Sequence, residues 1–330
     1  MTDHDDHNDD NAIERVLRAA GGRAQPSAQM KEAVRAAVHA QWREAVNQRK
    51  RRTHRVWLAA AASVALAAIG IVAMRTAFDA PGAVVASVSR ATGEVKSRDG
   101  IWTGWKSATV EHPVHGGDTV MTGSDGRAAL ALAGGVSLRL DRDTRIAFDD
   151  AEHVEVLAGA VYVDSGASGS THLLQVRTPA GAVRHVGTQY EVRLVGAGTR
   201  LRVREGRVEL TPADGAAHSV RAGEQVVVSK TGLLAREPVA TSGPEWDWVL
   251  HAAPPFDLDG RRVREFLTWA GRELGRDIVF ATPESEAEAD RAVLSGSMSG
   301  LTPAEAIAAV LPTTRLRSLE RDDAIVIALD

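Results

Sequence analysis

The chain has 330 residues, with 39 Lys and Arg against 43 Asp and Glu, a net charge of −4 and no cysteine. This length predicts about two or three domains. The small net charge excludes a chain-wide basic field that attracts nucleic acid, so no direct nucleic-acid partner is expected. The lack of cysteine excludes disulfides, thiolate metal sites and a cysteine nucleophile.

Residues 1–55 are predicted to be a helical segment. Apolar residues recur at helical spacing in two stretches, the first from Ile13 to Ala20 and the second after Pro26 and Ser27. The second stretch includes Val34, Val38 and Trp42. Two short amphipathic helices cannot bury their apolar stripes in a core of their own, so they either lie on a membrane surface or bind a partner protein. We predict that Val34, Val38 and Trp42 bind a partner; the alternative for Trp42 is an interfacial position near lipid headgroups.

Residues 56–74 form an uncharged apolar run that predicts one transmembrane helix. Five basic residues precede the run, and few follow it, which predicts a cytoplasmic N-terminus and a periplasmic C-terminus by the positive-inside rule. These orienting residues are Arg49, Lys50, Arg51, Arg52 and Arg55. The sequence therefore predicts a single-pass protein of a bacterial inner membrane, within a multi-domain fold class.

Residues 84–235 alternate apolar and polar side chains and are interrupted by turn signals, which predicts an all-β antiparallel domain. A weak glycine period also suggests stacked hairpin units. Its members are Gly135, Gly159, Gly181 and Gly206.

The last part of the chain is predicted to be a linker over residues 236–254 and a small α+β domain over residues 255–330. Three prolines and a Ser-Gly pair indicate the linker, and a fourth proline, Pro255, follows it directly. Beyond it, the expected element order is β-α-β-β-α-β. Its strands include Phe256–Leu258 and Val293–Leu294, and its second helix begins at a capping box from Thr302 to Glu305.

A search for an active site gives no enzyme signature. The histidines are scattered and do not show the spacing of two metal ligands on one helix face, and there is no nucleophile elbow or phosphate-binding loop. We therefore expect no metal, no cofactor and no enzymatic activity on another molecule.

Four segments together resemble the FecR domain. They are GDTVMTGSDGRAALALAGGVSLRLDRDTRIAF (117–148), LAGAVYV (157–163), VRTPAGAVRHVGTQYEVR (176–193) and REGRVEL (204–210). This resemblance implies a transmembrane anti-sigma factor. Such a regulator binds an extracytoplasmic-function-type sigma factor in the cytoplasm and receives a periplasmic signal from a TonB-dependent outer-membrane transducer. Residues 255–330 resemble the short N-terminal module of secretins and TonB receptors, which implies contact with the transducer's signalling domain.

The resemblance also implies possible self-cleavage between Gly187 and Thr188. The Thr188 hydroxyl can attack the Gly187 carbonyl, which converts the amide into an ester that water cleaves more easily. The alternative is that the pair is only a fold element, with glycine at a strand start. His185 is a weaker candidate for moving the proton. A different class of function also stays open: a membrane-anchored module that binds an envelope glycan or protein, with no sigma partner.

Overall fold

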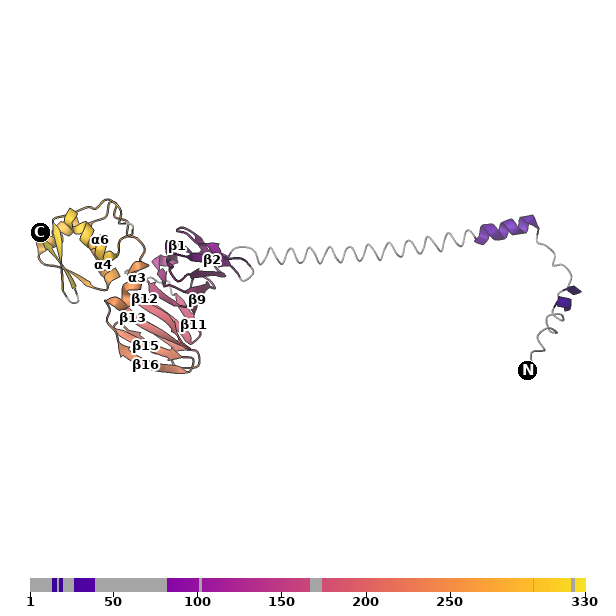
Figure 1. Ribbon diagram of the computed structural model, residues 1–330, viewed down its shortest axis with the longest axis horizontal. Coiled ribbons are helices and arrows are strands. Elements are labelled where there is room, and N and C mark those ends of the chain that lie inside the picture. The colour runs from indigo at the N-terminus through magenta and orange to yellow at the C-terminus, as the bar shows by residue number, and fades with distance from the viewer. Residues whose placement is uncertain are drawn as a thin grey trace, which may run out of the picture. The chain divides into compact units, whose positions relative to one another are not determined.

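The computed structural model describes residues 14–16, 18–19, 27–38, 82–100, 103–166, 174–298, 300–321 and 324–330. The chain separates into two compact units, residues 1–80 and residues 81–330. In the first unit, residues 28–38 form a helix whose start is marked by a hydrogen bond from the Met30 amide to the Ser27 hydroxyl (3.3 Å) (Figure 1). Ser27 therefore caps the N-terminus of this helix.

One part of the predicted fold class is wrong. Among the helices in the described ranges, none is long and apolar enough to cross a membrane. The longest, α4 (Val263–Leu274), has 12 residues, and at about 1.5 Å per residue it spans roughly 18 Å, well short of a bilayer core. The predicted span 56–74 lies outside the described residues, as do the five basic residues before it. The fold class is corrected to a chain dominated by a large curled β-sheet.

The sheet of the second unit has 16 strands within the described residues. They are β1 (Val84–Thr92), β2 (Val95–Asp99), β3 (Lys106–Ser107), β4 (Pro113–His115), β5 (Asp118–Thr122), β6 (Arg127–Leu132), β7 (Ser137–Leu140), β8 (Arg145–Phe148), β9 (His153–Ala158), β10 (Ala160–Asp164), β11 (Gln175–Thr178), β12 (Gly181–Val195), β13 (Gly198–Pro212), β14 (His218–Arg221), β15 (Glu224–Ser229) and β16 (Gly232–Pro238). The alternating segments predicted from the sequence fall in these strands, because alternation places one set of side chains in the core.

The main path of the sheet runs β3-β2-β5-β8-β9-β11-β12-β10-β7-β6-β1-β4. Neighbours pair antiparallel, apart from the parallel pair β9 and β11. From β12 the sheet continues through β13 to β14 and through β15 to β16, and Figure 1 shows β12, β13, β15 and β16 as successive neighbours. One hydrophobic cluster follows the strands, with Val120, Leu130, Val163 and Leu210 among its fully buried members.

The helices and remaining strands lie mostly in the C-terminal part. They are the 3-10 helices η1 (Ala133–Gly135), η2 (Pro244–Trp246) and η3 (Leu311–Thr313), the helices α3 (Asp247–His251), α4, α5 (Pro283–Arg291) and α6 (Pro303–Val310), and the strands β17 (Asp277–Phe280), β18 (Leu316–Glu320) and β19 (Ala324–Leu329). The three strands form a second sheet in the order β17-β19-β18. Its apolar core joins Phe266 and Leu267 of α4, Ile307 of α6 and Ile327 of β19.

The observed element order in the C-terminal part differs from the predicted one. Phe256–Leu258 is not a strand, and Val293 makes only an isolated bridge with Arg262. The helix α5, begun by a cap at Thr282 with proline at its first turn, stands where no helix was expected. The capping box of Thr302 and Glu305 is confirmed at the start of α6. The resemblance of residues 255–330 to a receptor N-terminal module stays a prediction.

Candidate functional site

The Gly187–Thr188 pair lies at a bulge in the middle of β12. The pairing of β12 with β13 shifts register between Val186 and Gln189, so Gly187 and Thr188 have no direct partners across the strand. Gly187 has a φ of 59° and Gly206, on the facing strand, a φ of 78°, which are left-handed conformations that favour glycine. A Cβ on Gly206 would come within 2.7 Å of both the Gly187 carbonyl oxygen and Thr188 Cγ2. Two glycines thus allow the bulge to close tightly around Thr188.

Ser165 holds the backbone of Thr188 at both polar groups. The Thr188 amide donates to Ser165 Oγ over 2.7 Å, and the Thr188 carbonyl accepts from the Ser165 amide and from Ser165 Oγ, each over 3.1 Å. Both residues are buried. The Thr188 hydroxyl has no hydrogen-bond partner among the described residues. A buried hydroxyl without a partner is costly, so a threonine in this position is a candidate for a chemical role.

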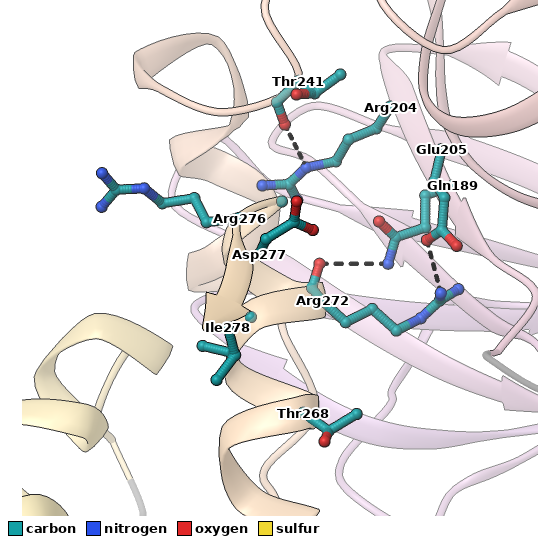
Figure 2. Close-up of a pocket in the computed structure, with 11 residues that line it drawn as sticks. Gln189, Arg204, Glu205, Thr241, Thr268, Arg272, Arg276, Asp277 and Ile278 are labelled. Carbon is teal, nitrogen blue, oxygen red and sulfur yellow. Dashed lines mark hydrogen bonds and ion pairs between the residues drawn. The ribbon is translucent and has the colours of Figure 1, made fainter. Parts of the chain in front are cut away.

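The strand after Thr188 is tied to the C-terminal part through its next residue. The side-chain nitrogen Nε2 of Gln189 donates to Asp164 Oδ2 over 3.0 Å. The same nitrogen lies 3.5 Å from the backbone carbonyl oxygen of Arg272 in α4. The Arg272 guanidinium pairs with Asp164 and with Glu205, each at 2.6 Å. Figure 2 shows Gln189, Glu205 and Arg272 converging on one side of a cleft of about 560 Å³ between the sheet and α4.

Charges next to this cleft are buried and paired. Arg139 of β7 donates to both carboxylate oxygens of Glu273 at 2.6 Å, and their side chains are 1% and 5% exposed. Burial alone lowers the pKa of Arg139, but the attraction and hydrogen bonds of Glu273 outweigh it and raise the pKa. For Asp164, burial raises the pKa, but the charge and hydrogen bond of Arg272 outweigh it, so the pKa is lowered. Arg139 and Asp164 therefore carry their charges at neutral pH.

Aromatic residues complete the attachment of the C-terminal part to the sheet. Tyr162 of β10 lies edge-on to Trp246 and Trp248, with ring centroids 6.0 Å and 6.5 Å apart. The Trp248 indole donates to Glu191 over 2.8 Å, and Trp246 is fully buried. Both tryptophans lie in the segment predicted as a linker, so this segment packs against the sheet.

The remaining predicted site residues lie in the first unit. Val34 and Val38, together with Met30, are 60%, 58% and 59% exposed on one face of the helix 28–38. Trp42 lies outside the described residues, as do Arg49, Lys50, Arg51, Arg52 and Arg55; the side chain of His185 is likewise outside what is described.

Sequence reasoning did not identify Ser165, Arg139 or Glu273. Ser165 follows a strand and precedes a glycine, which reads as an ordinary turn. Arg139 lies between Leu138 and Leu140, where alternation predicts a side chain facing water. The alternation of neighbouring residues does not show that a distant segment of the chain covers such a side chain.

The described residues hold no group of three or more His, Asp or Glu side chains arranged to bind a metal ion. His112 instead hydrogen-bonds Ser97 over 2.8 Å, and His115 lies 3.4 Å from Asp118. These contacts account for the two histidines as local partners of neighbouring polar groups.

Residues 118–209 match the family model described as FecR protein. No curated protein matches the sequence. Two crystal structures of a proposed anti-sigma factor from Parabacteroides distasonis are similar to the chain, with identities of 15% and 16%. Each covers 64% of this chain and 98% or 99% of its own, with a TM-score of 0.35, which is too low to define a shared arrangement. The family match alone confirms the resemblance predicted for this segment.

Proposed function

We propose that this chain, which carries a FecR domain over residues 118–209, is a membrane-associated regulator of an alternative sigma factor. The family match is the observation that carries the proposal. In this proposal, the N-terminal segment binds an extracytoplasmic-function-type sigma factor. The region that contains the FecR domain and residues 255–330 receives a signal from a TonB-dependent outer-membrane receptor through the receptor's signalling domain.

The exposed face of the helix 28–38 supports a partner-binding role for the N-terminal segment. Three large apolar side chains, Met30, Val34 and Val38, share this face, and each is more than half exposed. Their spacing of four residues places them along one line of the helix, which is the pattern of a helix that docks in an apolar groove of a partner. We assign Trp42, four residues after Val38 in the sequence, to the same interface.

The sigma partner is tested with the full chain, affinity-tagged and co-expressed with the extracytoplasmic-function sigma factors of its own genome. Wild-type protein should co-purify one of them, and Val34→Asp or Val38→Asp should lose it because a charge is placed in an apolar interface. Ala36→Asp is the matched control, since residue 36 is exposed on the opposite face of the same helix. Equal loss in the control, or retention in both valine variants, contradicts the assigned face.

Trp42→Ala tests the extent of the interface. A tryptophan at a desolvated centre typically contributes about 2–4 kcal/mol to binding, so affinity for the sigma factor should fall about 30- to 1000-fold. An interfacial membrane tryptophan instead leaves the affinity for the purified sigma factor unchanged. Binding of the detergent-solubilised full chain, measured by titration, separates the two outcomes.

We also propose that the chain cuts itself between Gly187 and Thr188. The support is local: a left-handed glycine before the bond, a tight bulge, and a buried threonine hydroxyl with no hydrogen-bond partner among the described residues. On a denaturing gel, the wild-type chain should give a fragment of residues 188–330. The fragment should vanish in Thr188→Ala and persist in Thr188→Ser, which keeps the nucleophile. A wild-type chain that stays intact contradicts self-cleavage and leaves the sigma assignment standing.

A further inference from the structure

At three places in the large sheet, one side-chain hydroxyl contacts both the backbone amide and the backbone carbonyl of a single other residue. We call each of these places a corner, the residue with the hydroxyl the holding residue, and the residue that it contacts the held residue. Each hydroxyl accepts from the amide of a residue and lies within hydrogen-bond distance of the carbonyl of that same residue, which follows one with positive φ. At Thr122 the hydroxyl donates over a shorter distance, 2.6 Å, to the Asp141 carbonyl. The holding and held residues, with the amide and carbonyl distances, are Thr122 and Thr144 (3.0 and 3.4 Å), Thr144 and Ala160 (3.0 and 3.1 Å), and Ser165 and Thr188 (2.7 and 3.1 Å). The preceding residues are Asp143 (φ 51°), Gly159 (φ 78°) and Gly187 (φ 59°). The arrangement is therefore a repeated element of this fold.

The third corner differs from the first two in the held residue. At the first, the hydroxyl of the held Thr144 is used to hold Ala160, and at the second the held residue is alanine, with no hydroxyl. At the third, the held Thr188 has a hydroxyl with no hydrogen-bond partner among the described residues. The amide hydrogen bond is also the shortest of the three, at 2.7 Å. Of the three corners, only this one has both a hydroxyl that is free to attack, on Thr188, and a second hydroxyl, on Ser165, in contact with the Thr188 amide nitrogen.

We propose that Ser165 is a catalytic residue of the self-cleavage, in which its hydroxyl delivers a proton to the amide nitrogen of Thr188; this rests on the proposed cut between Gly187 and Thr188. Thr188 Oγ1 forms a bond to the Gly187 carbonyl carbon, and its proton moves to the carbonyl oxygen, which becomes a hydroxyl in the tetrahedral intermediate. The bond from that carbon to the Thr188 nitrogen breaks as Ser165 Oγ gives the nitrogen a proton. Ser165 then recovers the proton that Thr188 Oγ1 released. The product is an isomer of the starting chain with an ester at Thr188 Oγ1 and a free amine at the Thr188 nitrogen. Water then cleaves this ester to the Gly187 carboxylate and the Thr188 hydroxyl.

The nitrogen is the atom of this reaction that most needs help. An amide nitrogen leaves poorly as an anion, so it must gain a proton as its bond to carbon breaks. The bulge is buried, with Thr188 0% and Ser165 2% exposed, so solvent does not readily supply that proton. Ser165 Oγ already lies 2.7 Å from the Thr188 nitrogen, and its hydroxyl donates a hydrogen bond to the Thr188 carbonyl. Once Thr188 Oγ1 has added to the Gly187 carbonyl carbon, the nitrogen is no longer a planar amide and carries a lone pair. Rotation of the Ser165 hydroxyl then lets Oγ donate to this nitrogen.

The first arm of the test compares cleavage rates in the full chain. A positioned acid typically contributes about 10²- to 10⁴-fold, so Ser165→Ala should slow the appearance of the 188–330 fragment by at least about 100-fold. Ser165→Thr should keep cleavage, since it keeps the hydroxyl. Thr144→Val is the matched control, because it removes the same pair of backbone contacts at another corner; its rate should stay within about threefold of wild type. Equal cleavage in Ser165→Ala and wild type overturns the assignment.

A second arm separates proton delivery from a merely structural role. In Ser165→Cys the donor is a thiol, the only one in a chain without cysteine, and it ceases to donate once it ionises. The ratio of its cleavage rate to that of wild type should therefore fall above about pH 8.5, the usual pKa of a thiol. Burial raises the thiol pKa and moves this fall to a higher pH. A pH-independent ratio contradicts proton donation. This arm also serves if Ser165→Ala does not fold.

A third arm locates the step with hydroxylamine, which cleaves esters but not ordinary amides. It should speed fragment release in wild type and leave folded Ser165→Ala intact, because the variant does not form the ester. Rapid hydroxylamine cleavage of Ser165→Ala overturns the assignment, since the acyl shift then proceeds without the serine. A wild-type chain that does not cut overturns the self-cleavage itself, whereas a cutting wild type with an equally active Ser165→Ala overturns only the role of Ser165.

Discussion

Arg139 and Glu273 are charged residues that the fold removes almost completely from water. The pair is bidentate, and Arg139 donates in addition to the Val249 carbonyl over 3.1 Å and lies over the Tyr162 ring. Removing a single partner of such a pair leaves the other charge buried without compensation. The cost is then far larger than the net contribution of the intact pair.

Glu273→Gln should lower the free energy of unfolding of the protein by about 3–5 kcal/mol, because Arg139 stays charged and buried. Urea unfolding of the purified chain measures it. Glu320→Gln is the control: Glu320 is 79% exposed and lies 3.6 Å from Arg276, so its loss should cost no more than about 1 kcal/mol.

A double variant sharpens this expectation. Replacing both residues, Arg139→Met with Glu273→Leu, should recover most of the lost stability, since no buried charge is left. A double variant as unstable as Glu273→Gln would show that the site requires the charges themselves and would contradict the reason given for the single substitution.

Low pH should destabilise the contact between the sheet and α4 by protonating Asp164, which pairs with Arg272. Its pKa is lowered in the folded protein, because Arg272 outweighs the effect of burial. A group with a depressed folded pKa stabilises the protein above its unfolded pKa, which is about 3.9 for aspartate, and that contribution disappears as pH falls through the folded value. The wild-type free energy of unfolding should therefore fall more steeply than that of Asp164→Asn below about pH 4. Parallel curves for the two proteins would contradict this.

At the scale of single elements, the bulge between β12 and β13 depends on Gly206. The closest approach at this position is to the backbone and side chain of the facing strand, so a larger residue meets atoms that cannot easily move. The bulge therefore requires glycine at residue 206 for two reasons: its left-handed φ and the contact with Gly187 and Thr188.

Gly206→Ala should destabilise the protein more than Gly223→Ala. The two glycines have nearly the same φ, 78° and 79°, so both substitutions carry a backbone cost of about 1–2 kcal/mol. At Gly223 the nearest atom to an added Cβ is 3.7 Å away, whereas at Gly206 two atoms lie at 2.7 Å. Crowding should add about 1–3 kcal/mol at Gly206 alone. Urea unfolding of both variants measures the difference, and equal losses would show that the bulge yields without strain.

The elements that could be predicted from the sequence are those with a clear period. Alternation identified strands such as β6 and β15, and a capping box identified the start of α6. The helix α5 was missed because only Ser285 and Ala289 of its residues are buried, which leaves no apolar stripe to detect. Phe256 was predicted to lie in a strand, but it lies in an irregular segment and packs on Phe266 and Trp269.

At the scale of the second unit, the attachment of the C-terminal part to the sheet could not be predicted. Its contacts join residues more than 100 positions apart, as between Arg139 and Glu273 or between Asp164 and Arg272. Periodicity reports which face of an element is apolar, but it does not report which other element covers a polar face. The candidate cleavage pair was predicted from a motif, whereas the serine beside it became visible only once β10 and β12 were paired.

The position of the Gly187–Thr188 bond within β12 has a mechanical consequence. In the intact chain, a pulling force that enters at β1 and leaves beyond α4 is carried by covalent bonds. After a cut at this bond, the same force crosses between the two pieces through the ladders of β10 with β12 and of β12 with β13, and through the Arg139–Glu273 pair. Strands pulled along their length must break many hydrogen bonds together, so the joint resists small loads and separates abruptly at larger ones. The cut would thus turn a permanent tether into a coupling with a force threshold.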